Sequence, residues 1–214
     1  MAISVAVPVG EETADRLIEK LAPRIEKLKV GPYTAGDDVD FGPVVTSAAK
    51  QNILNLVQSG IDQGAELVID GRDFSLQGYE NGFFVGPHLF DRVTPDMDIY
   101  KKEIFGPVLS TVRAGSYEEA IGLAMDHEYG NGTAIFTRDG DTARDFANRI
   151  NIGMVGVNVP IPVPLAYHTF GGWKKSVFGD LNQHGPDAFK FYTRTKTVTS
   201  RWPSGIKAVS YTHL

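Results

Sequence analysis

The sequence predicts an α/β fold in which helices flank a largely parallel sheet. Short β-rich apolar segments alternate along the chain with segments whose apolar residues recur at helical spacing, and Gly, Pro and Asp mark the turns between them. With 214 residues, of which 42% are hydrophobic and 22% charged, the chain is long enough to bury a core of ordinary composition.

The first elements follow this alternation. Residues 3–9 are β-rich and almost continuously apolar, which is typical of a strand covered on both faces. Residues 11–30 open with acidic residues and carry apolar residues at helical spacing, so we expect a helix there. Pro23 interrupts this segment, which predicts a kink or two short helices.

A loop, a second helix and further strands are expected next. Residues 31–45 are rich in Gly, Pro and Asp and indicate the loop, and the helix is expected from about Ser47. Residues 65–70 indicate a short strand, and residues 71–90 indicate turns around one or two more. The apolar face of the helix is predicted at Ile53, Leu54, Val57 and Ile61.

The alternation then continues through five segments. Ser116 is the predicted N-cap of the first helix among them, with Glu119 in the capping-box position. The expected order is strand, helix, strand, helix and strand, over residues 107–114, 116–127, 132–137, 141–150 and 153–159.

The pattern changes after Val159. Residues 160–187 are rich in Gly and Pro and show little periodicity, and so long an irregular segment inside a domain is usually functional or structurally special. Residues 189–202 alternate strictly, with threonine at every second position from 193 to 199, which predicts one long strand that pairs with a distant sheet or another subunit. We expect residues 204–214 to be a disordered or foreign tail.

Composition excludes several classes of function. A net charge of −5, with no basic cluster longer than Lys174-Lys175, argues against a nucleic-acid partner, and no apolar run is long enough to span a membrane. The absence of cysteine excludes disulfides, thiolate metal ligands and cysteine catalysis within these residues. The five histidines lack metal-ligand spacing, so no metal site is predicted; only His168, in the irregular segment, is a candidate for lining a site.

Three features have the chemistry of a binding site. The carboxylate of Glu103 can accept hydrogen bonds from both hydroxyls of a ribose, and Phe105 can pack against the sugar or a nicotinamide. In residues 170–176, adjacent glycines allow close backbone approach and Phe170 can form an apolar wall. Asn158 ends a predicted strand, where α/β sheets place ligand groups.

From spacing alone, each of these features has a simpler interpretation. Glu103 is then an exposed residue before a strand, with Phe105 in the core. Residues 170–176 are then a glycine turn beside an exposed lysine pair. Asn158 is then a structural residue, as most residues at strand ends are.

Four segments, taken together, resemble the aldehyde dehydrogenase superfamily in order and spacing: "EIFGPVL", "YGNGTAIFT", "GMVGVNVPIPVPL" and "FGGWKKS". The resemblance extends from Met1 to about Trp202, and the second and third segments are most similar to the CoA-acylating methylmalonate-semialdehyde branch. It implies that residues 1–187 are part of a catalytic domain, with a parallel sheet flanked by helices, and that residues 188–203 are the strand of an oligomerisation arm.

The resemblance also implies a reaction. Enzymes of this branch oxidise methylmalonate or malonate semialdehyde with NAD, release carbon dioxide and pass the acyl group to CoA, giving propionyl-CoA or acetyl-CoA. Glu103 would hold the nicotinamide ribose and Phe105 would pack beside it. Asn158, His168 and Phe170 would be substrate-side candidates.

The implied biological setting is a metabolic one. The resemblance points to a homo-oligomer, typically a homotetramer, assembled through residues 188–203 and acting in valine or inositol catabolism. Its other partners would be small molecules, namely the semialdehyde and CoA. The expected location is the cytoplasm, or the mitochondrial matrix in a eukaryote.

The nucleophile of this superfamily is a cysteine, and the resemblance places it immediately before Met1. We therefore expect the chain to be the C-terminal part of a thiolate dehydrogenase, inactive on its own, with no catalytic residue among its 214. The alternative is a short protein that starts at Met1 and acts as a non-catalytic module. It would bind a dehydrogenase through its strand arm or only occupy a nucleotide.

Overall fold

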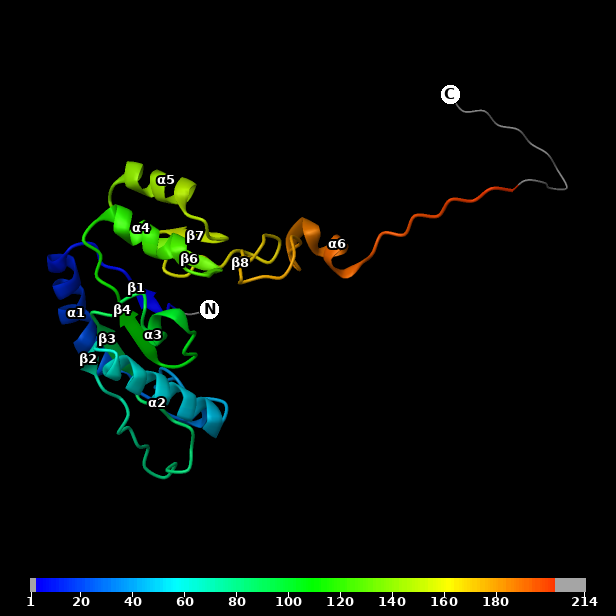
Figure 1. The fold of residues 1–214 in the computed structure, drawn as a ribbon. Coiled ribbons are helices and arrows are strands. Elements are labelled where there is room, and N and C mark those ends of the chain that lie inside the picture. Colours follow the sequence, from blue (N-terminus) through cyan, green and yellow to red (C-terminus); the bar gives the residue numbers. More distant parts are fainter. Residues whose placement is uncertain (1–2, 203–214) are drawn as a thin grey trace. The chain divides into compact units, whose positions relative to one another are not determined.

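The computed structural model describes residues 3–202 (Figure 1). These residues form two compact units. The first comprises residues 3–163 and 170–178, and the second comprises residues 164–169 and 179–202. The tail expected over residues 204–214 lies outside the described residues.

The main sheet of the first unit has four strands in the order β1-β4-β3-β2. β1 (Val5–Ala6) and β3 (His88–Asp91) both run parallel to β4 (Val108–Thr111), whereas β2 (Glu66–Ile69) is antiparallel to β3. The predicted α/β class with a largely parallel sheet is confirmed. Of the strand expected over residues 3–9, β1 covers two residues, and a parallel bridge between Val9 and Ala114 continues the pairing. The expected covering on both faces is wrong, because β1 is a partly exposed edge strand.

Two long helices, α1 (Glu11–Ile25) and α2 (Ser47–Asp62), lie on opposite faces of this sheet (Figure 1). α1 is a single helix, so the predicted division at Pro23 is wrong. Pro23 lies in the last turn, where its missing N–H removes only one hydrogen bond before the helix ends. α2 begins as predicted, after Thr46, whose hydroxyl accepts a 3.0 Å hydrogen bond from the Ala49 N–H.

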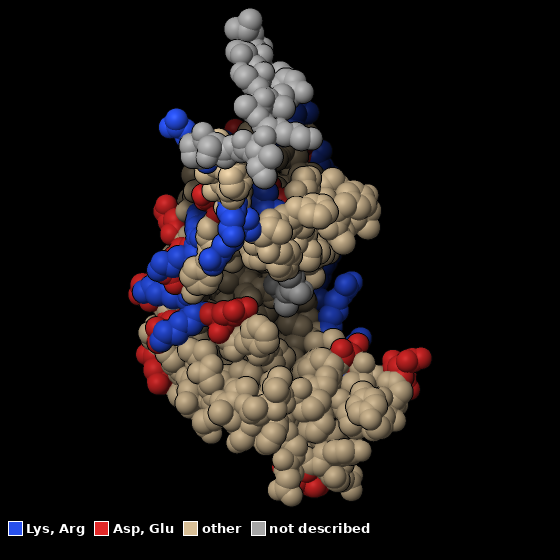
Figure 2. Space-filling model, turned by 90° about the vertical axis from the view of Figure 1, so that its right-hand side faces the viewer, with Lys and Arg blue, Asp and Glu red and all other residues tan. Residues whose placement is uncertain are grey.

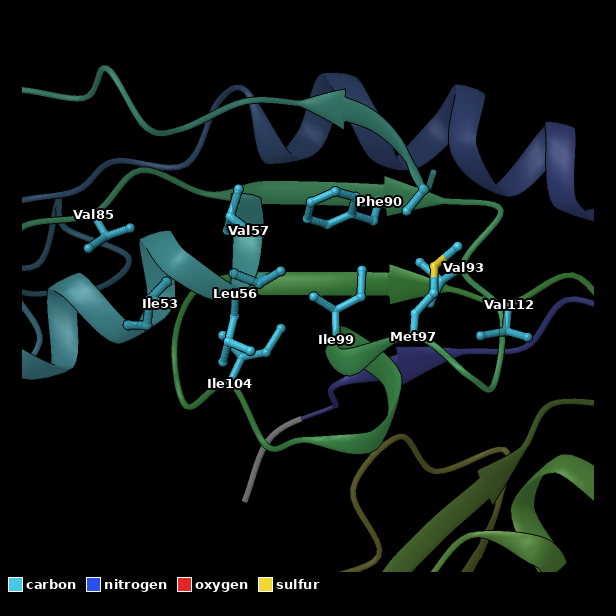
Figure 3. Close-up of a cluster of buried hydrophobic side chains, with 12 residues drawn as sticks. Ile53, Leu56, Val57, Val85, Phe90, Val93, Met97, Ile99, Ile104 and Val112 are labelled. Atoms are coloured by element: carbon cyan, nitrogen blue, oxygen red, sulfur yellow. The ribbon is translucent and has the colours of Figure 1, made fainter. Parts of the chain in front are cut away.

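The main core lies between α2 and the sheet (Figure 3). Val57 and Phe90 are completely buried there, and each such side chain contributes about 2 kcal/mol by leaving water. Gly60 lets α2 approach closely, because a Cβ at this position would lie 2.8 Å from the Ile99 side chain. Ile99 belongs to α3 (Asp98–Lys101), a four-residue helix that is too short to produce a detectable period.

The rest of the first unit contains two helices and two small sheets. β6 (Gly132–Ile135) and β7 (Met154–Val157) form a parallel pair. α4 (Tyr117–Asp126) and α5 (Gly140–Arg149) pack against this pair. β5 (Tyr129–Gly130) pairs antiparallel with β8 (Trp173–Lys174).

The N-cap of α4 is confirmed, since the Ser116 hydroxyl accepts a hydrogen bond from the Glu119 N–H at 3.2 Å. The second hydrogen bond of the predicted capping box, from a backbone N–H to the Glu119 side chain, has a different donor. The Glu119 carboxylate accepts from the Gly115 N–H at 2.7 Å, one residue earlier than Ser116.

The second unit contains a 3-10 turn (Gly185–Asp187) followed by α6 (Ala188–Tyr192). The long strand predicted from Phe189 is therefore wrong over its first four residues. Pro186 starts a helical turn, and the Thr193 hydroxyl ends it by donating to the Phe189 carbonyl. Among the described residues, 193–202 carry no assigned strand, and the predicted pairing with another subunit stays a prediction.

Candidate functional site

The loop between α3 and β4, residues 102–107, is fixed to the rest of the first unit at three points. Ile104 is buried in the main core (Figure 3). Gly106 passes so close to α2 that a Cβ there would lie 2.5 Å from the Ile53 Cδ1 atom. The Pro107 carbonyl also accepts a hydrogen bond from the His88 N–H at 2.8 Å. The loop is therefore a rigid support for the side chains that it exposes.

Glu103 and Phe105 are the side chains that this loop exposes. Phe105 is 81% exposed and has φ of 56°, in the left-handed region that bulky residues rarely adopt. Its interpretation as a core residue is therefore wrong. Among the described residues, no side chain or backbone group hydrogen-bonds to the Glu103 carboxylate. An exposed aromatic ring held in strained backbone beside an available carboxylate is typical of a ligand contact.

Asn158 joins two strand ends, in agreement with the structural interpretation of its position. Its side-chain amide forms two 3.0 Å hydrogen bonds with the backbone of Thr137, accepting from the N–H and donating to the carbonyl. Its own N–H donates to the Ile135 carbonyl at 2.8 Å. Asn158, at φ of 57°, thereby ties the end of β7 to the end of β6, and its amide is occupied.

The segment that contains Phe170, residues 170–176, depends on its glycines. Gly171 has φ of 73°, and a Cβ on Gly153 would lie 2.6 Å from the Gly171 Cα atom. The close backbone approach predicted for these glycines is therefore confirmed, and its partner is another part of the chain. Phe170 itself is half-buried at the start of this segment.

The neighbouring lysines differ from each other. Lys175 is exposed and pairs with Glu128, in agreement with the interpretation of an exposed lysine pair. For Lys174 that interpretation is wrong, because its ammonium group donates to three backbone carbonyls at the end of α4. The sequence gives no signal for this role, since the carboxyl end of a helix and a lysine about fifty residues later are brought together only by the fold.

His168 belongs to the second unit, whereas the other four candidates belong to the first. The His168 side chain is exposed, and its ring centroid lies 4.6 Å from that of Tyr167. The backbone N–H of His168 donates to the Leu165 carbonyl at 2.9 Å. The structure therefore brings Glu103 and Phe105 together on one loop, gives Asn158 a clamping role, and leaves Phe170 and His168 in separate units.

The charges of the described residues are mixed in sign. Figure 2 shows Lys and Arg interspersed with Asp and Glu along one side of the view.

Over residues 3–202, no group of acidic or histidine side chains could hold a metal ion. Burial raises the pKa of Tyr100, which precedes the Glu103 loop. Among the same residues, no helix combines the length and apolar character that crossing a membrane requires.

Comparison with known proteins places these features in a family. The model of the aldehyde dehydrogenase family matches residues 1–198. The chain is 62% identical over 203 residues to malonate-semialdehyde dehydrogenase of Pseudomonas aeruginosa, a match that covers 95% of this chain and 41% of that protein.

Solved structures agree with this match. A provisionally assigned methylmalonate-semialdehyde dehydrogenase from Sinorhizobium meliloti, complexed with NAD, is 75% identical, with a TM-score of 0.88, over 96% of this chain and 42% of that one. A methylmalonate-semialdehyde dehydrogenase from Oceanimonas doudoroffii is 54% identical, with a TM-score of 0.87, over 95% and 42%. The chain thus spans about two fifths of the length of the relatives that it matches.

Proposed function

The chain belongs to the aldehyde dehydrogenase family, and from this premise we propose that it is part of an NAD-dependent, CoA-acylating semialdehyde dehydrogenase. The proposed substrates are methylmalonate and malonate semialdehyde, and the products are propionyl-CoA and acetyl-CoA with loss of carbon dioxide. Support comes from similar proteins that carry these substrates in their names, among them a Bos taurus methylmalonate/malonate-semialdehyde dehydrogenase, acylating, at 47% identity.

The observation that carries the proposal is the geometry of the Glu103–Phe105 pair. The carboxylate and the strained, exposed ring stand on a loop whose intervening residue, Ile104, is fixed in the core. In the proposed complex, Glu103 accepts hydrogen bonds from the ribose hydroxyls next to the nicotinamide, and Phe105 packs beside that sugar. The bound NAD would supply the hydride acceptor.

Three residues are proposed for the substrate side. Phe170 provides an apolar wall, because it starts the segment that the glycines hold in place. Asn158 shapes the edge of β6 and β7 through the two hydrogen bonds of its amide to Thr137. His168 stays a substrate-side candidate from its position in the irregular segment.

The nucleophile in this proposal is a cysteine thiolate, which the 214 residues do not contain. We therefore expect these residues alone to show no turnover and weak binding of NAD. We further propose that residues 1–187 are part of the catalytic domain and that residues 188–203 are the arm of a homo-oligomer. The proposed location is the cytoplasm, or the mitochondrial matrix of a eukaryote.

The experiment that tests the function uses the complete protein that carries this chain. It is mixed with malonate or methylmalonate semialdehyde, NAD and CoA, and NADH and acyl-CoA are measured together. We expect both products in equal amounts, and their absence with both semialdehydes would overturn the proposal. The 214-residue chain, assayed in parallel, is expected to form neither product.

A further inference from the structure

The carboxyl-terminal turn of α4, residues 123–127, holds both candidate loops of the first unit. One loop, residues 102–107, carries Glu103 and Phe105 and follows α3. The other, residues 170–176, starts with Phe170 and contains β8. Neither loop is near this turn in sequence, so the contacts that join them to it are made only by the folded chain.

Lys174 joins the second loop to this turn. Its ammonium group donates hydrogen bonds to the carbonyls of Ala124, Met125 and His127 at 3.2, 2.7 and 3.0 Å. These carbonyls have no partner within the helix that ends there, and a cation at a helix carboxyl end also interacts favourably with the helix dipole. All three donor positions of the ammonium are thereby used.

Backbone and hydroxyl contacts extend this attachment on both sides of Lys174. The Lys175 N–H donates to the Glu128 carbonyl at 3.1 Å, and the Ser176 hydroxyl accepts from the Gly130 N–H at 3.0 Å. Lys174 has φ of 53°, a backbone conformation that persists only where surrounding contacts fix it. Its three hydrogen bonds are such contacts.

Tyr100 joins the first loop to the same turn. Its hydroxyl donates to the Leu123 carbonyl at 2.9 Å, and its ring lies edge-on to the ring of His127, with 5.2 Å between centroids. Nδ1 of His127 accepts from the Tyr129 N–H at 3.1 Å, which leaves Nε2 to donate to the Tyr100 carbonyl at 3.3 Å. Two residues separate Tyr100 from Glu103, so this contact fixes the start of the exposed loop.

We propose that Lys174 is a positioning residue that sets where the Phe170 segment stands relative to the Glu103–Phe105 loop, with the carboxyl-terminal turn of α4 as their common support. The inference rests on the proposed function for the role of Phe170 and Glu103. It adds a residue that touches neither substrate nor cofactor. Because a small displacement of a substrate-positioning group can cost much of the rate, the effect of losing Lys174 is expected in catalysis as well as in local order.

The first test measures local order in the complete protein that carries this chain. Lys174→Met keeps the aliphatic part of the side chain and the positive φ but removes the ammonium. Amide hydrogen exchange of the peptide over residues 170–176 should become about tenfold faster, as expected for the loss of hydrogen bonds to a charged group. Lys175→Met is the matched control and should leave this exchange unchanged.

An internal reference guards against general unfolding. Exchange of the buried α2 peptide over residues 53–60 should not change in Lys174→Met. If it does, Lys174→Gln replaces it, because that side chain keeps a shorter donor group. Lys174→Arg, which keeps the charge and the donors, should retain protection of residues 170–176. Unchanged exchange in this segment on removal of the ammonium would overturn the proposal.

The second test measures catalysis and coupling. Lys174→Met should lower kcat/KM for the semialdehyde about tenfold, and Lys175→Met should stay within about twofold. Combining Lys174→Met with Tyr100→Phe should give a loss that differs from the product of the single losses, because both residues bind one support. Unchanged kcat/KM in Lys174→Met, or strictly multiplicative losses, would contradict the positioning role.

The two proposals fail in different ways. If the unmodified protein does not oxidise the semialdehydes, the proposed function falls and the exchange experiment still decides whether Lys174 holds the segment. If the protein is active and hydrogen exchange of residues 170–176 is the same in Lys174→Met as in the unmodified protein, the proposed function stands and this inference falls.

Discussion

Ile104 and Phe105 are adjacent in the chain and have opposite surroundings. Ile104 is 8% exposed and lies in the main core, whereas Phe105 is 81% exposed with φ of 56° (Figure 3 shows Ile104). The buried residue fixes the loop, and the strained residue presents an aromatic ring to solvent. Exposure of such a ring has a cost in solvation and in backbone strain, which binding of a ligand to the ring would offset.

Replacing Phe105 with glycine should separate stability from binding. Glycine adopts positive φ without strain, so the free energy of unfolding should stay unchanged or rise by up to about 1 kcal/mol. The KM for NAD should rise, because the ring that we propose packs beside the ribose is lost. Urea denaturation and steady-state kinetics measure the two effects, and Tyr33→Gly, at another exposed aromatic residue, is the control for kinetics. A large loss of stability would show that Phe105 is structural.

Replacing Ile104 with alanine should lower both stability and cofactor binding. The substitution leaves a cavity beside Ile53 and Leu56 of α2, and a buried isoleucine-to-alanine change costs about 2–5 kcal/mol. Because the loop loses its anchor, the KM for NAD should rise even in molecules that stay folded. Ile104→Val, which removes one methylene, should cost about 1 kcal/mol and leave KM almost unchanged. Equal KM values for all three proteins would contradict the anchoring role.

Much of this fold follows from local pattern. The helix from Ser47 to Asp62 has a side-chain N-cap and a buried face. From Val108 to Val157, strands and helices alternate in the predicted order. The errors have local causes. Pro23 is tolerated because it stands in the last turn of α1, and the alternation over residues 189–192 fits one helical turn as well as a strand.

The candidate site was predictable only in part, because its geometry depends on distant contacts. The proposed role of Glu103 and Phe105 depends on the resemblance, because spacing alone favours a core position for Phe105. Asn158 was placed at a strand end correctly, but its bond to Thr137 depends on how β6 lies beside β7. The role of Lys174 could not be predicted from the sequence, because its partners are backbone carbonyls, which every residue has.

His88 should make stability depend on pH near neutrality. It is almost fully buried, and burial lowers its pKa from the ordinary value, against the opposing effect of Asp70 at 3.9 Å. The unfolded chain therefore binds the proton of His88 more readily than the folded chain does. Above the unfolded pKa of about 6.5, His88 is neutral in both states and the folded state keeps its full stability. As the pH falls below this value, protonation of the unfolded chain lowers the free energy of unfolding. Between pH 7.5 and 5.5, the free energy of unfolding should fall more steeply than in His88→Gln. Parallel pH profiles for the two proteins would contradict this assignment.

Arg113 should be far more important for stability than a surface arginine. It binds the buried Asp91 with two nitrogens, at 3.1 and 2.6 Å, and reaches Asp15 of α1 at 2.8 Å. Burial alone would raise the pKa of Asp91, but the hydrogen bonds from Arg113 and from the Arg92 N–H bring it below its ordinary value. Arg113→Met removes the ion-pair partner of the buried Asp91 carboxylate and should cost about 3–5 kcal/mol.

The control for this prediction is Arg16→Met, which removes an exposed ion pair with Glu12 within α1. That change should cost no more than about 0.5 kcal/mol. Urea denaturation of both variants at pH 7 measures the difference. Similar costs would show that the Asp91–Arg113 pair contributes no more than a surface contact.

Binding of NAD to the complete protein that carries this chain, measured by calorimetry with Glu103→Gln, tests the central claim most directly. Gln keeps the size of the side chain and removes the charge that strengthens hydrogen bonds from the ribose hydroxyls. We predict a Kd about tenfold higher than in the unmodified protein, and no change for Glu19→Gln, an exposed glutamate on α1. A Kd within about twofold of the unmodified value for Glu103→Gln would contradict the assignment of this loop as the ribose-binding site.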